Sequence, residues 1–232
     1  YERLGLPIME VYGMTENCGV SHATLLGVQR PGTVGTAYDG VQSRIDPVSG
    51  EIQMKSAGLM LGYYKEPVLT RDALTADGWL RTGDKGSLDP EGNLKITGRV
   101  KDLFKTSKGK YVAPAPIEDK IVMNGAVEAC AVVGANMGQP IGLGMLSPGG
   151  IERAASDPEG LKAELAEHLK SINETLDPHE QMDCIVLFKQ PWTVDNGLIT
   201  PTFKVKRNDV DKAFGKQYET WAESRQKVIL AD

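Results

Sequence analysis

Residues 98–118 read GRVKDLFKTSKGKYVAPAPIE and separate two parts of the chain that differ in the spacing of their apolar residues. Before Arg99, short runs of alternating apolar residues lie between Gly, Pro and Asp turns, as at 50–56 and 93–97. After Arg99, apolar residues recur at helical spacing, most regularly over 161–172. The sequence therefore predicts an α+β protein, in which a small β-rich, barrel-like region is followed by a compact α+β domain.

Helix-start signals divide the second part further. Pro116 is placed to begin a helix that Gly125 would end. Asp157 is placed to cap a helix whose first residue is Pro158. Asn208 is placed to cap a last helix, whose apolar stripe is Val210, Phe214, Tyr218 and Trp221.

The glycine-rich segment 134–150, GANMGQPIGLGMLSPGG, follows a strand expected at 127–134 and looks at first like a nucleotide-binding loop. It lacks the spacings GxGxxG and GxxxxGK[ST], and Pro140 and Pro148 interrupt any helix that should follow. We interpret it as a surface connection. A further strand is expected at 184–188.

The composition is that of an ordinary soluble protein, with 41% hydrophobic and 25% charged residues. The formal net charge of -5 argues against nucleic acid as a partner. No apolar run reaches the roughly 18 residues of a membrane span, so we expect a cytoplasmic protein and leave a peripheral membrane contact open. The chain opens on Tyr1 rather than Met and in mid-pattern, which favours a fragment of a longer protein.

The three cysteines do not predict disulfides, because they are odd in number and lack CxxC spacing. They are Cys18, Cys130 and Cys184. We interpret them as small buried apolar side chains in a reducing compartment.

Four polar segments carry the residue types of a nucleotide site. In chain order they are YGMTE at 12–16, GWLRTGD at 78–84, GRVKD at 98–102 with KTSKGKYVAPAPIE at 105–118, and TPTFKVKR at 200–207. A nucleotide site needs an apolar surface for the base, acceptors for the ribose hydroxyls and cations for the phosphates. Tyr12 offers an aromatic face, Thr15 a hydroxyl for a phosphate oxygen, and Glu16 an oxygen ligand for Mg²⁺.

The later segments supply the remaining groups. Asp84 follows a strand-like run and is suited to accept two ribose hydroxyls. Arg99 is a fork-shaped donor for ribose or phosphate oxygens, and Lys204 is a mobile charge that can reach an α-phosphate. Taken singly, each segment also has an ordinary explanation as a turn or as surface charge, so their order along the chain carries the argument.

Together the four segments resemble the adenylate-forming superfamily of acyl-CoA synthetases, luciferases and adenylation domains. The resemblance runs from about Tyr12 to about Arg207. GKYVAPAPIE and TPTFKVKR are most similar to the long-chain fatty acyl-CoA synthetase branch, and TFK at 202–204 replaces the TGK that other branches usually show.

The resemblance implies roles for the residues before Lys101. Tyr12 would lie against adenine, and Gly13 would let the loop approach it. Thr15 would contact phosphate, and Glu16 would help to bind Mg²⁺. Two further residues would hold the ribose, namely Asp84 and Arg99.

For the second part, the resemblance implies a hinge at Asp102. Residues 1–101 would then be the β-rich end of the large AMP-binding domain, and 102–232 the small mobile α+β domain. Lys204 would promote adenylation. The loop near the pantetheine thiol of CoA would be formed by Lys108, Gly109 and Lys110.

The implied reaction uses ATP, Mg²⁺, a fatty acid and CoA, and passes through an acyl-adenylate with loss of pyrophosphate and then AMP. The family's phosphate loop and most of its acyl pocket are not in this sequence, so we expect the isolated chain to be inactive without the preceding N-terminal part. Three alternatives stay open: a ligase that loads a carrier protein, a non-catalytic nucleotide-binding module, and a structural docking domain.

Overall fold

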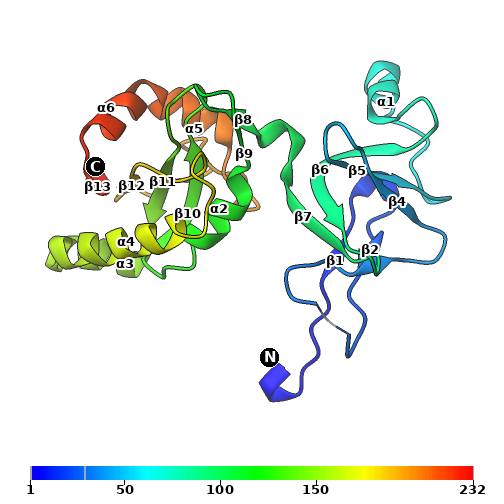
Figure 1. Cartoon of the computed structure of the whole chain (residues 1–232), viewed down its shortest axis with the longest axis horizontal. Helices are drawn as coiled ribbons and strands as arrows, with labels where there is room; N and C mark the ends of the chain where they lie inside the picture. The colour runs from blue at the N-terminus through cyan, green and yellow to red at the C-terminus, as the bar shows by residue number, and fades with distance from the viewer. Residues whose placement is uncertain (1, 29, 232) are drawn as a thin grey trace. The chain divides into compact units, whose positions relative to one another are not determined.

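The computed structural model describes residues 2–28 and 30–231, and the chain divides into two compact units, Tyr1–Lys101 and Asp102–Asp232 (Figure 1). The first unit is mainly β-sheet, and the second combines a four-stranded sheet with helices. The prediction of an α+β fold with a β-rich first part is confirmed.

The first unit is built from short strands. Its elements are η1 (Glu2–Leu4), β1 (Val11–Tyr12), η2 (Thr15–Asn17), β2 (His22–Ala23), β3 (Thr36–Ala37), β4 (Gln42–Ile45), β5 (Glu51–Lys55), α1 (Pro67–Ala73), β6 (Leu80–Leu88) and β7 (Leu94–Arg99). β4, β5, β6 and β7 form one antiparallel sheet in sequence order, and β1, β2 and β3 form another.

The four-stranded sheet curls because its register shifts twice, between Glu51 and Gln53 on β5 and between Lys85 and Gly86 on β6. Gly86 is required at the second shift, since a Cβ there would lie 2.5 Å from the Lys95 carbonyl oxygen. The alternation on β5 is as predicted and buries Ile52 against the core of the unit.

The second unit has longer helices. After η3 (Val100–Asp102), its elements are β8 (Phe104–Lys105), β9 (Tyr111–Val112), α2 (Pro114–Ile121), β10 (Val127–Val133), β11 (Ile141–Leu146), α3 (Pro148–Ser156), α4 (Pro158–Asn173), β12 (Ile185–Phe188), α5 (Arg207–Phe214), η4 (Gly215–Gln217), α6 (Tyr218–Glu223) and β13 (Val228–Ala231). The main sheet has the order β10-β11-β12-β13, with the first pair antiparallel and the others parallel.

Both faces of this sheet are covered, with α3 and α4 on one side and α5 and α6 on the other (Figure 1). Alternate residues of β12 supply the two cores: Ile185 and Leu187 pack with the α2 and α4 side chains, whereas Val186 and Phe188 pack with the 192–222 region. This explains why β12 is apolar at every position.

Of the three helix starts predicted from the sequence, one is confirmed, one is displaced by two residues and one is wrong. α4 begins at Pro158 as predicted, and the Gly160 amide donates to Asp157 Oδ1 at 3.0 Å. α2 begins at Pro114, two residues before the predicted Pro116, and ends at Ile121. The prediction for Asn208 was wrong, because α5 begins at Arg207 and the apolar stripe runs over two helices separated by η4.

The interpretation of 134–150 as a surface connection was wrong. Residues 141–146 form β11, a buried strand in the interior of the sheet, and Pro148 is the first residue of α3 rather than a helix breaker. Glycine at 144 fits this interior position, since a Cβ would lie 3.0 Å from the Ala129 carbonyl oxygen. The interpretation of all cysteines as buried was also wrong, because Cys18 is exposed.

Candidate functional site

Tyr12 anchors the candidate site in the first unit. β1 pairs with β2 so that Tyr12 lies opposite His22, and the Tyr12 side chain is buried. Its hydroxyl donates a hydrogen bond of 2.6 Å to Asp84 Oδ2. Burial, followed by the hydrogen bond to Asp84, raises the pKa of Tyr12 well above its ordinary value, so the phenol remains a donor at neutral pH.

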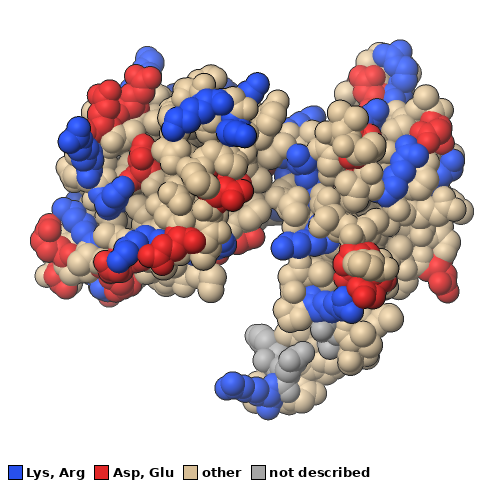
Figure 2. All heavy atoms as spheres, viewed as in Figure 1, with Lys and Arg blue, Asp and Glu red and all other residues tan. Residues whose placement is uncertain are grey.

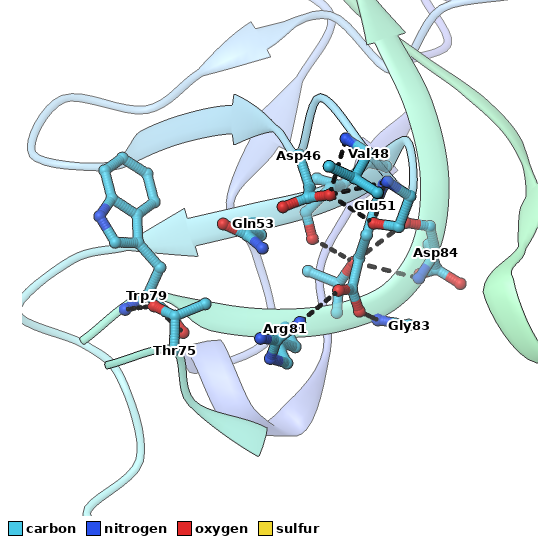
Figure 3. Close-up of polar contacts among 12 residues, drawn as sticks. Asp46, Val48, Glu51, Gln53, Thr75, Trp79, Arg81, Gly83 and Asp84 are labelled. Atoms are coloured by element: carbon cyan, nitrogen blue, oxygen red, sulfur yellow. Dashed lines mark hydrogen bonds and ion pairs between the residues drawn. The ribbon is translucent and has the colours of Figure 1, made fainter. Parts of the chain in front are cut away.

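Within β6, the pairing with β5 is irregular between Arg81 and Lys85, and Asp84 follows Gly83 in this stretch, 82–84, which we call the glycine turn. Side chains and backbone groups hold it in place (Figure 3). The Thr82 hydroxyl donates to the Ile52 carbonyl at 2.7 Å and accepts the Asp84 amide at 3.1 Å. The Gly83 amide donates to Glu51 Oε1 at 2.9 Å. Gly83 has φ of +75°, which favours glycine at this turn.

Glu51 is a nearly buried carboxylate beneath this turn, with its side chain only 9% exposed (Figure 3). Its second oxygen, Oε2, accepts a hydrogen bond of 3.4 Å from Arg81. A buried carboxylate is stable only when it is paired and hydrogen-bonded, and here Arg81 and the Gly83 amide meet that need. Glu51 was not predicted as a site residue, although a Glu beside an Ile at the start of a strand-like run is a signal in the sequence.

Arg99 lies directly opposite Asp84 in the β6–β7 pairing. Its Nε is 3.3 Å from Asp84 Oδ1, and its side chain is 65% exposed, so its remaining donors face solvent. The structure therefore brings Tyr12, Asp84 and Arg99, from three separate motifs, into direct contact.

The loop after Tyr12 is tightly folded. A Cβ on Gly13 would lie 2.0 Å from the Gly19 carbonyl oxygen, so only glycine fits there. Thr15 is exposed, and Glu16 Oε1 accepts a 2.7 Å hydrogen bond from the Tyr63 hydroxyl. Tyr63, like Glu51, was not predicted from the sequence.

Glu16 and Thr15 present hard oxygen donors, which suit Mg²⁺ when substrate phosphates and water complete its shell. Within residues 2–28 and 30–231, no three His, Cys, Asp or Glu side chains gather as a metal cluster. A dedicated all-protein metal cage is therefore not found in the described part of the chain, whereas a carboxylate shared with a nucleotide fits the residues present.

In the second unit, the β8–β9 hairpin carries the predicted CoA loop. Its turn is closed by the Thr106 amide donating to the Lys110 carbonyl at 2.8 Å. Gly109 has φ of +78°, and Lys108, Gly109 and Lys110 are all exposed. The loop thus presents two ammonium groups around a glycine to solvent.

Lys204 lies in another hairpin, closed by an antiparallel bridge between Ile199 and Val205. The Lys204 amide donates to the Thr200 hydroxyl at 3.1 Å. The Lys204 side chain is exposed, and no acidic group among the described residues pairs with it. Its ammonium is available to a ligand. Asp102, the predicted hinge, is the first residue of the second unit.

Neither positive nor negative charge dominates the surface in view. Figure 2 shows Lys and Arg interspersed with Asp and Glu on the visible face of each unit. None of the helices in the described ranges has the length and apolar character needed to cross a membrane.

Comparison with known proteins agrees with this geometry. A family profile described as AMP-binding enzyme C-terminal domain matches residues 101–223, more than half of the chain. The chain therefore belongs to the AMP-binding enzymes, and its matched part is their C-terminal domain.

The resemblance to long-chain acyl-CoA synthetases is also confirmed. Long-chain-fatty-acid–CoA ligase 5 of Mus musculus is 31% identical over 247 residues, covering 95% of this chain. The chain spans only 36% of that relative's length.

Two solved structures show the same fold. The adenylation domain of a carboxylate reductase from Mycobacterium chelonae superposes with a TM-score of 0.76 at 24% identity, over 93% of this chain and 34% of its own. The ATP-bound RpMatB-BxBclM chimera B1 gives a TM-score of 0.72 at 27% identity. That match covers 92% of this chain and 42% of the chimera.

Proposed function

We propose that this chain is the C-terminal part of an ATP-dependent long-chain fatty acid–CoA ligase, which joins a fatty acid to AMP and then to CoA. The observation that carries the proposal is the contact of Tyr12 and Arg99 with the Asp84 carboxylate. Residues from three motifs that lie far apart in the sequence meet there. Their acceptor and donor groups would suit the hydroxyls of a ribose.

In the first half-reaction, a carboxylate attacks the α-phosphorus of ATP and pyrophosphate leaves. Asp84 would accept the ribose hydroxyls, with Arg99 beside it as a donor. The Tyr12 ring would lie against adenine, and Gly13 would give the nucleotide close access to the backbone. Mg²⁺, held by Glu16 beside the Thr15 hydroxyl, would neutralise phosphate charge.

Lys204 would stabilise the negative charge that develops at the α-phosphate as the acyl-adenylate forms. The exposed hairpin on which it lies supports this role, because its ammonium has no acidic partner among the described residues.

In the second half-reaction, the thiol of CoA attacks the acyl carbonyl and AMP leaves. The exposed loop of Lys108, Gly109 and Lys110 would approach CoA, with its ammonium groups attracting phosphate. Asp102 would be the hinge about which 102–232, as the small domain, turns between the two steps, while 1–101 completes the large domain.

Relatives support the substrate class. The mouse relative is a long-chain-fatty-acid–CoA ligase by name, and the chimera is bound to ATP. The remaining two-thirds of such an enzyme would supply the phosphate loop and acyl pocket. We expect the present chain alone to be inactive, and we propose a cytoplasmic location for the whole enzyme, with a peripheral membrane contact left open.

The test uses the full-length protein, meaning this chain with the preceding part that its relatives possess. Pyrophosphate release is measured with ATP, Mg²⁺ and a panel of carboxylic acids, each with and without CoA. We expect release with long-chain acids and a thioester only when CoA is present. No release with any acid would contradict the proposal and favour a non-catalytic module, whereas adenylate without thioester would favour a carrier-protein acceptor.

A further inference from the structure

A bidentate ion pair joins Glu118 on α2 to Arg207 at the start of α5. Arg207 Nη1 lies 2.6 Å from Glu118 Oε1, and Nη2 lies 2.9 Å from Oε2. The side chains are 15% and 22% exposed for Glu118 and Arg207 respectively. Two parallel N–H···O bonds fix direction as well as distance, so the pair holds the two helices in one relative position.

The same pair is bonded to the main sheet. Glu118 Oε1 accepts the Val132 amide at 2.6 Å, and Arg207 Nη1 donates to the Val132 carbonyl at 3.1 Å. Val132 is fully buried on β10. Both charged groups are therefore anchored to one residue of the rigid sheet.

Arg207 lies at the root of the hairpin that carries Lys204. The bridge from Ile199 to Val205 closes the hairpin, and the Lys206 amide donates to the Leu198 carbonyl at 2.8 Å, directly before Arg207. Beyond this root, the hairpin tip is exposed and the described structure gives Lys204 only the Thr200 bonds of its own backbone.

Arg207 also faces the predicted hinge. Its Nε is 3.9 Å from Asp102 Oδ2, a long contact that adds a second carboxylate to the group. The segment that begins the second unit and the root of the Lys204 hairpin thus share one guanidinium.

We propose that Arg207, held by Glu118, is a positioning residue that fixes the Lys204 hairpin for adenylation. The inference rests on the proposed function. Arg207 does not touch the nucleotide in this scheme; it acts by limiting where Lys204 can point. A displacement of about 1 Å of a catalytic group can cost on the order of 100-fold in rate, so a fixed root matters for a side chain on an exposed tip.

The test compares both half-reactions in the full-length protein. The first is single-turnover adenylate formation from ATP and palmitate, and the second is thioester formation from synthetic palmitoyl-adenylate and CoA. The variants are Arg207→Gln, Glu118→Gln, Lys204→Ala and the double variant Lys204→Ala with Arg207→Gln. Arg153→Gln is the matched control, because Arg153 pairs with Glu164 at 2.8 Å between α3 and α4, away from the hairpin.

We expect Arg207→Gln to slow adenylation about 10- to 100-fold, with the KM for ATP nearly unchanged. Thioester formation should change less than threefold or so, and the Arg153→Gln control should leave both steps intact. In the Lys204→Ala background, Arg207→Gln should cause little further loss, because both changes remove the same contribution.

Equal losses in both half-reactions, or losses that multiply with that of Lys204→Ala, would overturn the inference and assign the pair to stability alone. If Arg207→Gln fails to fold, the same comparison of the two half-reactions is made with Glu118→Gln. The side-chain amide oxygen of that variant can still accept the Val132 amide, while the charge of the Glu118 carboxylate is lost. Failure of the proposed function looks different: the unaltered protein would then form no adenylate at all.

Discussion

The Tyr12 hydroxyl and the Asp84 carboxylate lie 2.6 Å apart, and Asp84 presents its other oxygen to Arg99. The carboxylate is therefore held from both sides before any ligand arrives. Its side chain is 15% exposed, so it meets solvent along a narrow face. If Asp84 has the proposed role of accepting ribose hydroxyls, a carboxylate oriented in this way would lose little conformational freedom on binding.

Tyr12→Phe should weaken nucleotide binding to the full-length protein about three- to tenfold, because the ring remains while the bond that orients Asp84 is lost. Isothermal titration with AMP would measure the change. Tyr64→Phe is the control, since Tyr64 is 86% exposed. Unchanged affinity in Tyr12→Phe would show that Arg99 and the turn alone orient the carboxylate.

Glu51→Ala should also weaken AMP binding, because the Gly83 amide loses its acceptor and the turn before Asp84 relaxes. We expect a loss of about 1–3 kcal/mol in stability of the folded protein, together with a loss of affinity. Melting curves recorded with and without AMP separate the two effects. Glu128→Ala, at an exposed position of β10, serves as the comparison and should alter neither.

Gly13→Ala should destabilise the YGMTE loop, since its methyl group would lie 2.0 Å from the Gly19 carbonyl oxygen. The backbone must move to admit it, at a cost of about 1–3 kcal/mol. The melting temperature of the full-length protein reports this directly. Gly138→Ala, where a Cβ meets nothing within 4 Å, should be nearly neutral. Equal melting temperatures for both variants would argue against the close approach at Gly13.

His22 should make stability depend on pH. Burial lowers the pKa of His22 from 6.5 to about 4 in the folded protein, between the hydroxyls of Ser21 and Ser43. Between these pH values the unfolded chain binds a proton that the folded protein does not, so stability falls as pH drops from about 6.5 toward 4.

The loss should amount to roughly 1–3 kcal/mol, and His22→Gln should flatten this part of the profile. Melting temperatures at pH 7, 6 and 5 for both proteins would test it. If the two profiles run parallel, other groups cause the acid sensitivity.

Much of the fold could be predicted because the sequence signals for its helices and strands are local. Asp157 and Pro158 lie together in sequence and define the start of α4 without reference to anything distant. The same applies to the alternation in β5. β11 was missed because its glycines lower its apparent apolarity, and only the folded sheet shows that it lies between β10 and β12 with a core on each face.

The candidate site was predictable as a set of residues and not as a set of contacts. The motifs name Tyr12, Asp84 and Arg99, yet nothing in their spacing states that the Tyr12 hydroxyl reaches Asp84. Glu51 and Arg207 were missed for a related reason: each acts through a partner that is distant in sequence, Gly83 and Glu118 respectively.

The sheet of the second unit also sets an order of assembly. β10 and β11 are joined by a short connection and pair antiparallel, whereas Ile185 on β12 must find Val228 on β13 across the whole Lys204 hairpin and three helical segments. Local pairings form faster than pairings that close long loops. The Lys204 hairpin therefore lies in one of the two long connections, β11 to β12 and β12 to β13, that close after β10 and β11 have paired, and its root becomes rigid only after that local pairing.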